Sequence, residues 1–302
     1  MAKSYILYEA HIVKLFNQCE NLVWQGRFFD KVSACKPRSQ RVKEGQRNGG
    51  EPKTDVYVLL ENTKTELKEI IKISVKKDNA EFFANKLNAT VAEDLLGCDW
   101  KNILIKNIKL IQERFTQQKI TYFKNNSGVK DAFFTLGWKL EIINKSRKLS
   151  VPLILSQEEV IQLIYKGINQ PDSKRNAVVF GKVEENSGIA DYLLKGDINK
   201  HQTVESIIKD LKFLDSYTPE NLHLAFTANN YRFKANKADG DRHLAVSINW
   251  EVEEGRLKPN FDFNNPLAFT GQKDKMPLIK SCLSELDIKK IEDINFDEIK
   301  PL

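Results

Sequence analysis

A β-hairpin over residues 55–77 is the feature of the sequence that most constrains the fold. Residues 55–61 form a run of strand-favouring side chains, the polar segment 62–65 follows, and residues 66–77 form a second such run. Two runs of this kind joined by a short polar connection are typical of a hairpin. We therefore expect a sheet early in the chain, and the side chains on its two faces indicate what it can do.

The faces of the hairpin follow from the length of its turn. If the four-residue turn makes Glu61 face Glu66, then Asp55 lies opposite Lys72, and alternation along each strand sorts the side chains. One face is apolar and suited to packing against helices, and it holds Val56, Val58, Leu60, Ile71, Ile73 and Val75. The other face holds Asp55, Lys72, Ser74 and Lys76. A carboxylate and a lysine are thereby expected close together at the open end of the hairpin.

An aspartate on one strand and a lysine on the next form an arrangement suited to metal-dependent cleavage of a phosphodiester. The Asp55 carboxylate would bind a hard divalent ion through oxygen, as Mg²⁺ requires. Lys76 would lie near the attacking water and the scissile phosphate, where its charge stabilises additional negative charge. The alternative is a surface ion pair between the two strands that has no catalytic role.

The residues around this pair resemble a known nuclease family. The segment Gly49-Gly50-Glu51-Pro52-Lys53-Thr54-Asp55 leads into the first strand, and Ile73-Ser74-Val75-Lys76 lies in the second. These segments resemble the PD-(D/E)XK nuclease superfamily and, within it, type II restriction endonucleases with a variant active site. Pro52 and Asp55 match the first element, and Ser74 and Lys76 match the second. Ser74 stands where the family usually has an acidic residue.

The resemblance implies a fold and a catalytic set. The fold is α/β (α+β), with a restriction-endonuclease-like core, a mixed central β-sheet flanked by helices, and a C-terminal DNA-recognition region. The expected catalytic residues are Asp55, Ser74 and Lys76, and the expected cofactor is Mg²⁺. Because a serine hydroxyl is a weak neutral ligand, the ion would depend more on Asp55, the Val75 carbonyl, waters and the DNA phosphate.

A further carboxylate is expected to complete the metal site. Glu9 or Glu20 from the first helix could supply it, and the sequence alone does not choose between them; Glu20 is taken into the expected ligand set with Asp55 and Val75. A literal Glu-x-Lys also occurs at residues 66–68. It lies six residues from Asp55 along the strand in the expected register, or roughly 20 Å away, and is rejected on that distance.

Two groups of residues are candidates for DNA contacts, because a nuclease acting on duplex DNA needs both phosphate and base-edge contacts. The first group comes from a basic, glycine-containing loop over residues 31–53, and it comprises Arg38, Arg41, Arg47 and Lys53. The second group comes from the C-terminal half, and it comprises Asn229, Asn230, Arg232, Lys234, Arg242 and Arg256. Asn and Arg side chains read adenine and guanine edges. The alternatives are a disordered loop and ordinary strand and turn surface.

The remaining periodicity gives a mixed succession of elements. Apolar spacing predicts helices over residues 5–24, 80–96 and 100–118. The second half is expected to contain a helix from Ser156 to about residue 165, strands at 177–183, 222–233 and 243–251, with turn material at 229–230, and helices at 204–214 and 284–297. Residues 1–130 are expected to hold the first helix, the basic loop and the catalytic core. Residues 131–302 would hold the rest of the core and the DNA-recognition region, although one domain is also consistent with the sequence.

The composition excludes several classes of protein. The chain has 302 residues, 41% hydrophobic and 29% charged, which excludes a disordered, collagen-like or disulfide-scaffold protein. No apolar run approaches the length of a membrane span, so no membrane partner is expected. The four cysteines, Cys19, Cys35, Cys98 and Cys282, lie far apart, which favours reduced thiols and a cytoplasmic location. The net charge of +6 permits a polyanionic partner without requiring one.

The function expected from these features is that of a type II restriction endonuclease, which hydrolyses double-stranded DNA at specific sequences with Mg²⁺. Its partners would be duplex DNA, a second copy of the chain if it acts as a homodimer, and a cognate DNA methyltransferase in the same system. Two alternatives remain open at this point. One is a repair or structure-selective nuclease of the same fold, and the other is a DNA-binding protein without catalysis.

Overall fold

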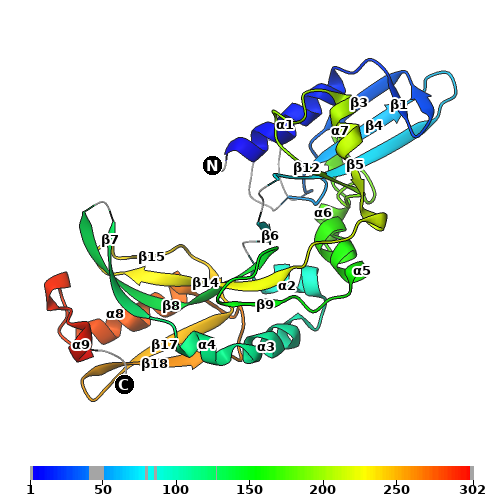
Figure 1. Ribbon diagram of the computed structural model, residues 1–302. Helices are drawn as coiled ribbons and strands as arrows, with labels where there is room; N and C mark the ends of the chain where they lie inside the picture. Colours follow the sequence, from blue (N-terminus) through cyan, green and yellow to red (C-terminus); the bar gives the residue numbers. More distant parts are fainter. Residues whose placement is uncertain (1–2, 41–50, 79–80, 85–86, 127, 300–302) are drawn as a thin grey trace. The chain divides into compact units, whose positions relative to one another are not determined.

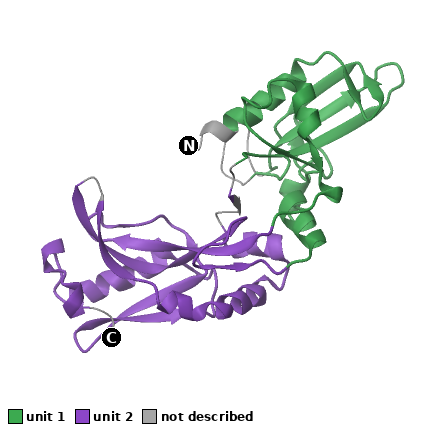
Figure 2. Ribbon diagram, in the orientation of Figure 1, with its two compact units in different colours: residues 1–80, 155–220 green, residues 81–154, 221–302 purple. Residues whose placement is uncertain are grey.

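The computed structural model describes residues 3–40, 51–78, 81–84, 87–126 and 128–299 (Figure 1). The chain forms two compact units, each built from two separate segments (Figure 2). Unit 1 contains residues 1–80 and 155–220, and unit 2 contains residues 81–154 and 221–302. The division expected from the sequence used a single boundary, at residue 130. Within the described ranges, no helix is long and apolar enough to cross a membrane.

A mixed five-stranded sheet forms the centre of the described part of unit 1. Its strands run in the order β13-β12-β5-β4-β3. Their bounds are β3 (Lys31–Cys35), β4 (Val56–Glu61), β5 (Lys68–Lys76), β12 (Tyr192–Lys195) and β13 (Lys212–Phe213). Strand β12 is parallel to β5, whereas the other neighbours are antiparallel. The expected mixed sheet is therefore confirmed, although β3 occupies residues that were expected to belong to a loop.

Helices and small hairpins complete unit 1. Its helical segments are α1 (Lys3–Asn17), α5 (Gln157–Glu159), the π-helix η1 (Val160–Lys166), α6 (Asp172–Arg175), α7 (Val204–Asp210) and the 3₁₀ segment η2 (Leu214–Ser216). Its two small hairpins are formed by β1 (Leu22–Trp24) with β2 (Arg27–Phe29), and by β10 (Val178–Val179) with β11 (Lys182–Val183). Ser156 and Glu159 form the expected capping box. The first helix ends at Asn17, because the apolar residues expected to continue it form β1 instead.

The apolar face of the hairpin packs into the core of unit 1, as the alternation of apolar and polar side chains along its strands predicts. All six side chains of that face are buried, namely Val56, Val58, Leu60, Ile71, Ile73 and Val75. Helix α1 contributes Tyr8, Ile12 and Phe16 to the same cluster, at the spacing that places side chains on one face of a helix. Packing of α1 on this face leaves the opposite face of the sheet for Asp55, Ser74 and Lys76.

The register of the hairpin differs from the expected one by two residues. Tyr57, not Asp55, lies opposite Lys72. The turn is longer than expected because Asn62 N–H donates to the Leu67 carbonyl at 2.8 Å and Glu66 adopts a φ of 58°. A shift of two residues keeps every side chain on its expected face. It also moves Asp55 two residues closer to Lys76 along β5.

Unit 2 is built on a strongly curved antiparallel sheet that forms a half-barrel (Figure 1). Five of its described strands follow the order β15-β14-β8-β17-β18, while β6 and β7 also pair with β8, and β9 pairs with β14. These strands are β6 (Phe82–Ala84), β7 (Thr121–Asn126), β8 (Val129–Ile143), β9 (Ser150–Pro152), β14 (His223–Arg232), β15 (Lys237–Ala238), β17 (Val246–Glu253) and β18 (Arg256–Asp262). A two-stranded sheet is formed by β16 (His243–Leu244) and β19 (Phe269–Thr270). At Gly137 an added Cβ would lie 2.3 Å from the Val246 carbonyl oxygen, so the close pairing of β8 with β17 requires glycine.

The helical segments of unit 2 differ in part from those expected. They are α2 (Ala89–Leu96), α3 (Trp100–Leu110), α4 (Gln112–Thr116), the π-helix η3 (Gly271–Lys275), α8 (Met276–Glu285), the 3₁₀ segment η4 (Ile291–Asp293) and α9 (Phe296–Ile299). The helix expected from residue 80 begins only at Ala89, after its cap Asn88. The closing helix expected over residues 284–297 is replaced by η4 and α9, which follow the end of α8.

The isoleucines Ile70 and Ile71 on β5 allow a matched test of the hairpin faces. Ile71 is fully buried, whereas Ile70 is 43% exposed on the other face. We expect Ile71→Ala to lower the free energy of unfolding by about 2–5 kcal/mol, because it removes buried apolar volume. We expect Ile70→Ala to lower it by less than about 1 kcal/mol. Urea denaturation followed by circular dichroism measures both, and equal losses would contradict this assignment of the faces.

Candidate active site

Asp55 is held at the start of β4 by backbone hydrogen bonds on both sides. Its own N–H donates to the Ile73 carbonyl at 2.8 Å. The preceding N–H groups of Lys53 and Thr54 both donate to the carbonyl of Gly188, at 3.0 and 3.1 Å. A Cβ on Gly188 would lie 1.8 Å from the carbonyl oxygen of Lys174 on α6, so only glycine lets this loop pass so close to α6. The position of Asp55 is therefore fixed by the backbone of unit 1.

The Asp55 carboxylate is buried, with an exposure of only 8%, and it meets three groups of β5. Its Oδ2 accepts a hydrogen bond from Val75 N–H at 2.7 Å and another from the Ser74 hydroxyl at 3.3 Å. The Lys76 ammonium lies 3.9 Å from the same oxygen. The structure thus brings together the aspartate, serine and lysine that the sequence assigned to one site.

The Val75 carbonyl faces the same side of the strand as the carboxylate. In an extended strand the N–H and C=O of one residue point to the same edge. Since Val75 N–H donates to Asp55, its carbonyl oxygen also points to the edge where Asp55 lies. The Val75 side chain is buried in the core on the apolar face. The expected carbonyl ligand is therefore correctly oriented relative to Asp55.

Glu9, and not Glu20, is the glutamate of the N-terminal segment that lies near Asp55. Glu9 is 4% exposed on α1, and burial together with the negative charge of Asp55 raises its pKa to about 7. Glu20 follows the end of α1 and is exposed, and its charge acts on the nearby Cys19 thiol. Placing Glu20 in the ligand set assumed a helix that continued to residue 24. With Ile12 and Phe16, Glu9 follows the i, i+3, i+7 spacing of the buried face, a signal present in the sequence.

A series of hydrogen bonds next to Glu9 connects helix α1 to helix α7 of the same unit. The Tyr8 hydroxyl forms a short hydrogen bond with Nδ1 of His201, which is fully buried. The other ring nitrogen of His201, Nε2, lies 3.1 Å from a carboxylate oxygen of Asp210 on α7. Since Tyr8 immediately precedes Glu9, this chain fixes the turn of α1 that carries the glutamate.

Lys36 connects Glu9 to a second acidic side chain. Its ammonium lies 2.5 Å from Glu9 and 3.1 Å from Glu51. Burial lowers the pKa of Lys36, but its contacts with the two carboxylates outweigh that effect and raise it. Sequence patterns assign Lys36 no individual role, because its partner Glu9 lies on a helix 27 residues away.

Lys53, expected to contact DNA from the loop, lies near Asp55 and Lys76. Burial and the nearby positive charge of Lys76 lower its pKa to about 7, although the negative charge of Asp55 acts in the opposite direction. Its aliphatic stem packs closely over Gly167, which adopts a φ of 74° at the end of η1. Two lysines, Lys53 and Lys76, therefore interact with the Asp55 carboxylate.

The electrostatics of the site are dominated by the burial of carboxylates. Burial raises the pKa of Asp55, while the Lys76 charge and the Val75 N–H lower it. Among the residues that the structure describes, no group of three or more His, Cys, Asp and Glu side chains could hold a metal ion. Mg²⁺ does not need such a group, because it usually retains waters and binds through one or two carboxylates plus substrate phosphates. Asp55, the Val75 carbonyl and Glu9 therefore fit this ion chemically.

The other expected DNA contacts of unit 1 are only partly described. Arg38 is half-buried, and its backbone exchanges hydrogen bonds with Val178 on β10, at 3.1 and 2.8 Å. Arg41 and Arg47 lie outside the described residues. Of this group, Arg38 thus lies beside β10 and Lys53 lies near Asp55.

Asn229 and Asn230 are buried in β14 and do not form a turn. They lie at a bulge in the pairing of β14 with β8, and their exposures are 0% and 6%. The Asn229 amide donates to the Gly240 carbonyl at 3.1 Å, and the Asn230 amide donates to Asp239 at 2.9 Å. In this conformation neither amide faces solvent, so neither can reach a base edge.

The four basic residues among the expected DNA contacts of the C-terminal half differ in exposure and in their partners. Arg232 forms an ion pair with Asp239 and lies over the Phe133 ring. Lys234 and Arg256 are exposed, and Arg242 is half-buried. Exposed lysine and arginine remain available to phosphates, whereas Arg232 would have to leave its carboxylate partner. All of these residues belong to unit 2, whereas Asp55, Ser74 and Lys76 belong to unit 1.

Comparison with known proteins gave no match. No family model, no curated protein and no solved structure matches the chain. The interpretation of the site therefore rests on its own geometry: a buried aspartate, a lysine on the neighbouring strand, a backbone carbonyl on the same edge and a second buried carboxylate close by.

The two glutamates allow a direct test of the metal ligands. We expect Glu9→Gln to weaken Mn²⁺ binding by about tenfold or more, because it removes a negative charge close to Asp55. We expect Glu20→Gln to leave the affinity unchanged, because this side chain is exposed beyond the helix. Isothermal titration calorimetry with Mn²⁺ measures both variants. The opposite ranking would show that the choice of Glu9 is wrong.

Proposed function

We propose that the chain is a Mg²⁺-dependent endonuclease of the PD-(D/E)XK type that cleaves double-stranded DNA at specific sequences. The observation that supports it most is the contact of the buried Asp55 carboxylate with Lys76 across neighbouring strands. A structural ion pair has no need to bury a second carboxylate beside the first. Glu9 is such a carboxylate: it pairs with Lys36, yet burial and the negative charge of Asp55 still raise its pKa to about 7, which favours a cation site over a simple ion pair.

The residues of the site have distinct roles in this proposal. Asp55, the Val75 carbonyl and Glu9 would hold Mg²⁺, which when bound polarises the phosphate and lowers the pKa of a coordinated water. Lys76 places a fixed positive charge where negative charge develops on the phosphate oxygens. Lys53 also interacts with Asp55 and Lys76, and its pKa of about 7 leaves it only partly charged at neutral pH. The burial of the site strengthens these interactions, because less water screens them.

Ser74 acts on the position of Asp55. Its hydroxyl donates to Oδ2 of the carboxylate, and it is itself 3% exposed. A serine at this place does not supply the charge of the acidic residue that the family usually has. In our proposal that charge comes from Glu9, from a different element.

The architecture of unit 1 supports a restriction-endonuclease-like core. Its mixed sheet carries the catalytic residues on β4 and β5, with β12 parallel to β5 on the far side. Helix α1 covers the apolar face. Unit 2 would then be the DNA-recognition region, with the exposed Lys234 and Arg256 among its phosphate contacts. A homodimer and a cognate methyltransferase that protects host DNA belong to the same proposal.

Removal of either central side chain tests the proposal. We expect Asp55→Ala and Lys76→Ala to reduce Mg²⁺-dependent cleavage of unmethylated plasmid by at least roughly 10²–10³-fold, the loss typical when one electrostatic group is removed. DNA binding should remain. Lys72→Ala is the matched control, because Lys72 shares the strand and the face but pairs with Asp191 at 3.2 Å. Gel analysis of the plasmid fragments gives the rates.

Three outcomes of that experiment would contradict the proposal. If wild-type protein binds DNA without cutting it, and Asp55→Ala binds equally well, the chain is a DNA-binding protein without catalysis. If the fragments have scattered ends, the enzyme is a structure-selective or repair nuclease of the same fold. If Lys72→Ala is as inactive as Lys76→Ala, the position of Lys76 next to Asp55 does not explain the activity.

The hydroxyl of Ser74 should contribute modestly. We expect Ser74→Ala to slow cleavage by roughly five- to tenfold, because it removes one hydrogen bond worth about 1 kcal/mol to the carboxylate. Ser33→Ala on the neighbouring β3 is the control for the loss of a sheet serine. The single-turnover rate measures this effect. A loss as large as that of Asp55→Ala would mean that Ser74 itself binds the reacting groups.

A further inference from the structure

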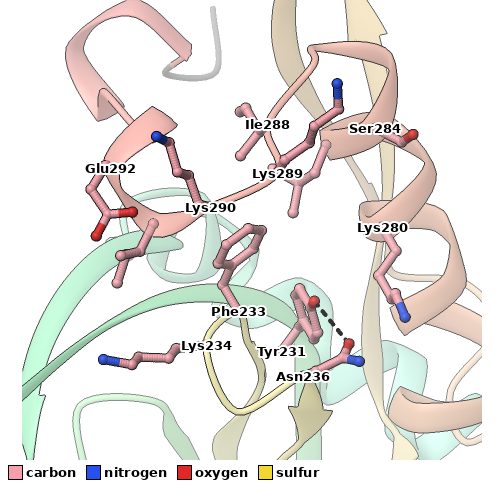
Figure 3. Close-up of a pocket in the computed structure, with 12 residues that line it drawn as sticks. Tyr231, Phe233, Lys234, Asn236, Lys280, Ser284, Ile288, Lys289, Lys290 and Glu292 are labelled. Carbon is pink, nitrogen blue, oxygen red and sulfur yellow. Dashed lines mark hydrogen bonds between the residues drawn. The ribbon is translucent and has the colours of Figure 1, made fainter.

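Unit 2 contains a cavity that the proposed nuclease site does not use. Its volume is about 560 Å³, within the size range of small-molecule and nucleotide sites. The cavity lies between the end of β14 and the segment that runs from α8 to η4 (Figure 3). Its lining residues include Phe233, Lys234 and Asn236 from the first of these elements and Lys280, Lys290 and Glu292 from the second.

Two aromatic rings form one wall of the cavity. Tyr231 and Phe233 are next-but-one neighbours, and their ring centroids lie 6.4 Å apart at an angle of 76°. Tyr231 is 3% exposed, and its hydroxyl donates to the Asn236 side-chain oxygen at 3.2 Å. Phe233 is only half-buried and lies at the centre of the lining residues (Figure 3). The wall therefore offers a ring for stacking and a polar amide beside it.

The rim of the cavity is strongly basic. It carries four lysines against a single acidic residue, Glu292. Lys234 and Lys290 lie on one side of Phe233 and Lys280 on the other (Figure 3). Lys289 pairs with Asp287, but both side chains are about 80% exposed, so this pair holds the lysine only weakly. The charge of the rim complements an anion that extends past both sides of the ring.

We propose that this cavity binds one nucleotide of a DNA strand, with the base stacked on Phe233 and the flanking phosphates at Lys234 and Lys280. Aromatic side chains in a basic groove are the usual means of binding single-stranded nucleic acid, because every base has a face that can stack. Lysines on both sides of the ring suit a base that has a phosphate before and after it. A free mononucleotide carries its phosphate on one side only.

The inference goes beyond the proposed nuclease. Binding of a DNA strand at this cavity requires neither Mg²⁺ nor Asp55. The strand-binding proposal and the nuclease proposal can therefore fail separately. If unit 1 does cleave DNA, the cavity would receive a base that is unstacked from the duplex or lies in a single-stranded stretch, at the cost of unstacking it.

The test uses the full-length protein, EDTA and a fluorescent single strand of roughly ten nucleotides that contains 2-aminopurine. We expect Phe233→Leu to weaken binding by roughly tenfold and to abolish the change in 2-aminopurine fluorescence, because the ring is lost. Phe233→Tyr should retain both, which separates stacking from any loss of folding. Thermal melts of all variants accompany the titrations.

The lysines are tested through salt dependence. We expect the double variant Lys234→Gln/Lys280→Gln to lower the slope of log affinity against log salt by about 1.4, since each phosphate contact with a single strand contributes about 0.7. The control is Lys101→Gln/Lys109→Gln, which removes two exposed lysines from α3 in the same unit.

Three results would overturn the proposal. One is an equal effect of the cavity and control lysine variants. Another is binding that Phe233→Leu leaves unchanged. The third is that free deoxynucleoside monophosphates displace the fluorescent strand as strongly, per phosphate, as an unlabelled strand does. The cavity would then be a mononucleotide site.

Discussion

The arrangement of charges in unit 1 depends on one buried carboxylate, that of Asp55, which lies just before β4. A buried carboxylate is costly unless hydrogen bonds and positive charge compensate it. The Val75 N–H, the Ser74 hydroxyl and the Lys76 ammonium do so here. Glu9, however, adds a second buried carboxylate in the same region, and its pair with Lys36 offsets the cost only in part. An arrangement that is costly for the folded chain and favourable for a bound cation is typical of a functional site.

The rest of unit 1 positions these charges. The apolar face of the hairpin binds α1 through Tyr8, Ile12 and Phe16, and the same helix carries Glu9. The loop that ends at Gly188 fixes the backbone just before Asp55. Elements from both chain segments of the unit thus meet at one carboxylate.

Much of this arrangement could be predicted from the sequence, because alternation in strands depends only on local order. The two faces of the hairpin, and with them Asp55, Ser74 and Lys76, follow from it. The register could not be predicted, since it depends on a backbone conformation at Glu66 that few residues adopt. The choice of Glu9 depends on where α1 ends. The burial of Asn229 depends on long-range pairing within unit 2, about which local patterns contain no information.

The most direct test of the central claim is the position of a metal ion. Crystals of the protein soaked with Mn²⁺ would show the ion by its anomalous scattering. Our account predicts one strong peak, coordinated by the Asp55 carboxylate and the Val75 carbonyl oxygen, with Glu9 close by. A site that binds no ion at saturating Mn²⁺, with Lys76 still paired to Asp55, would contradict it, as would a peak bound elsewhere in the chain.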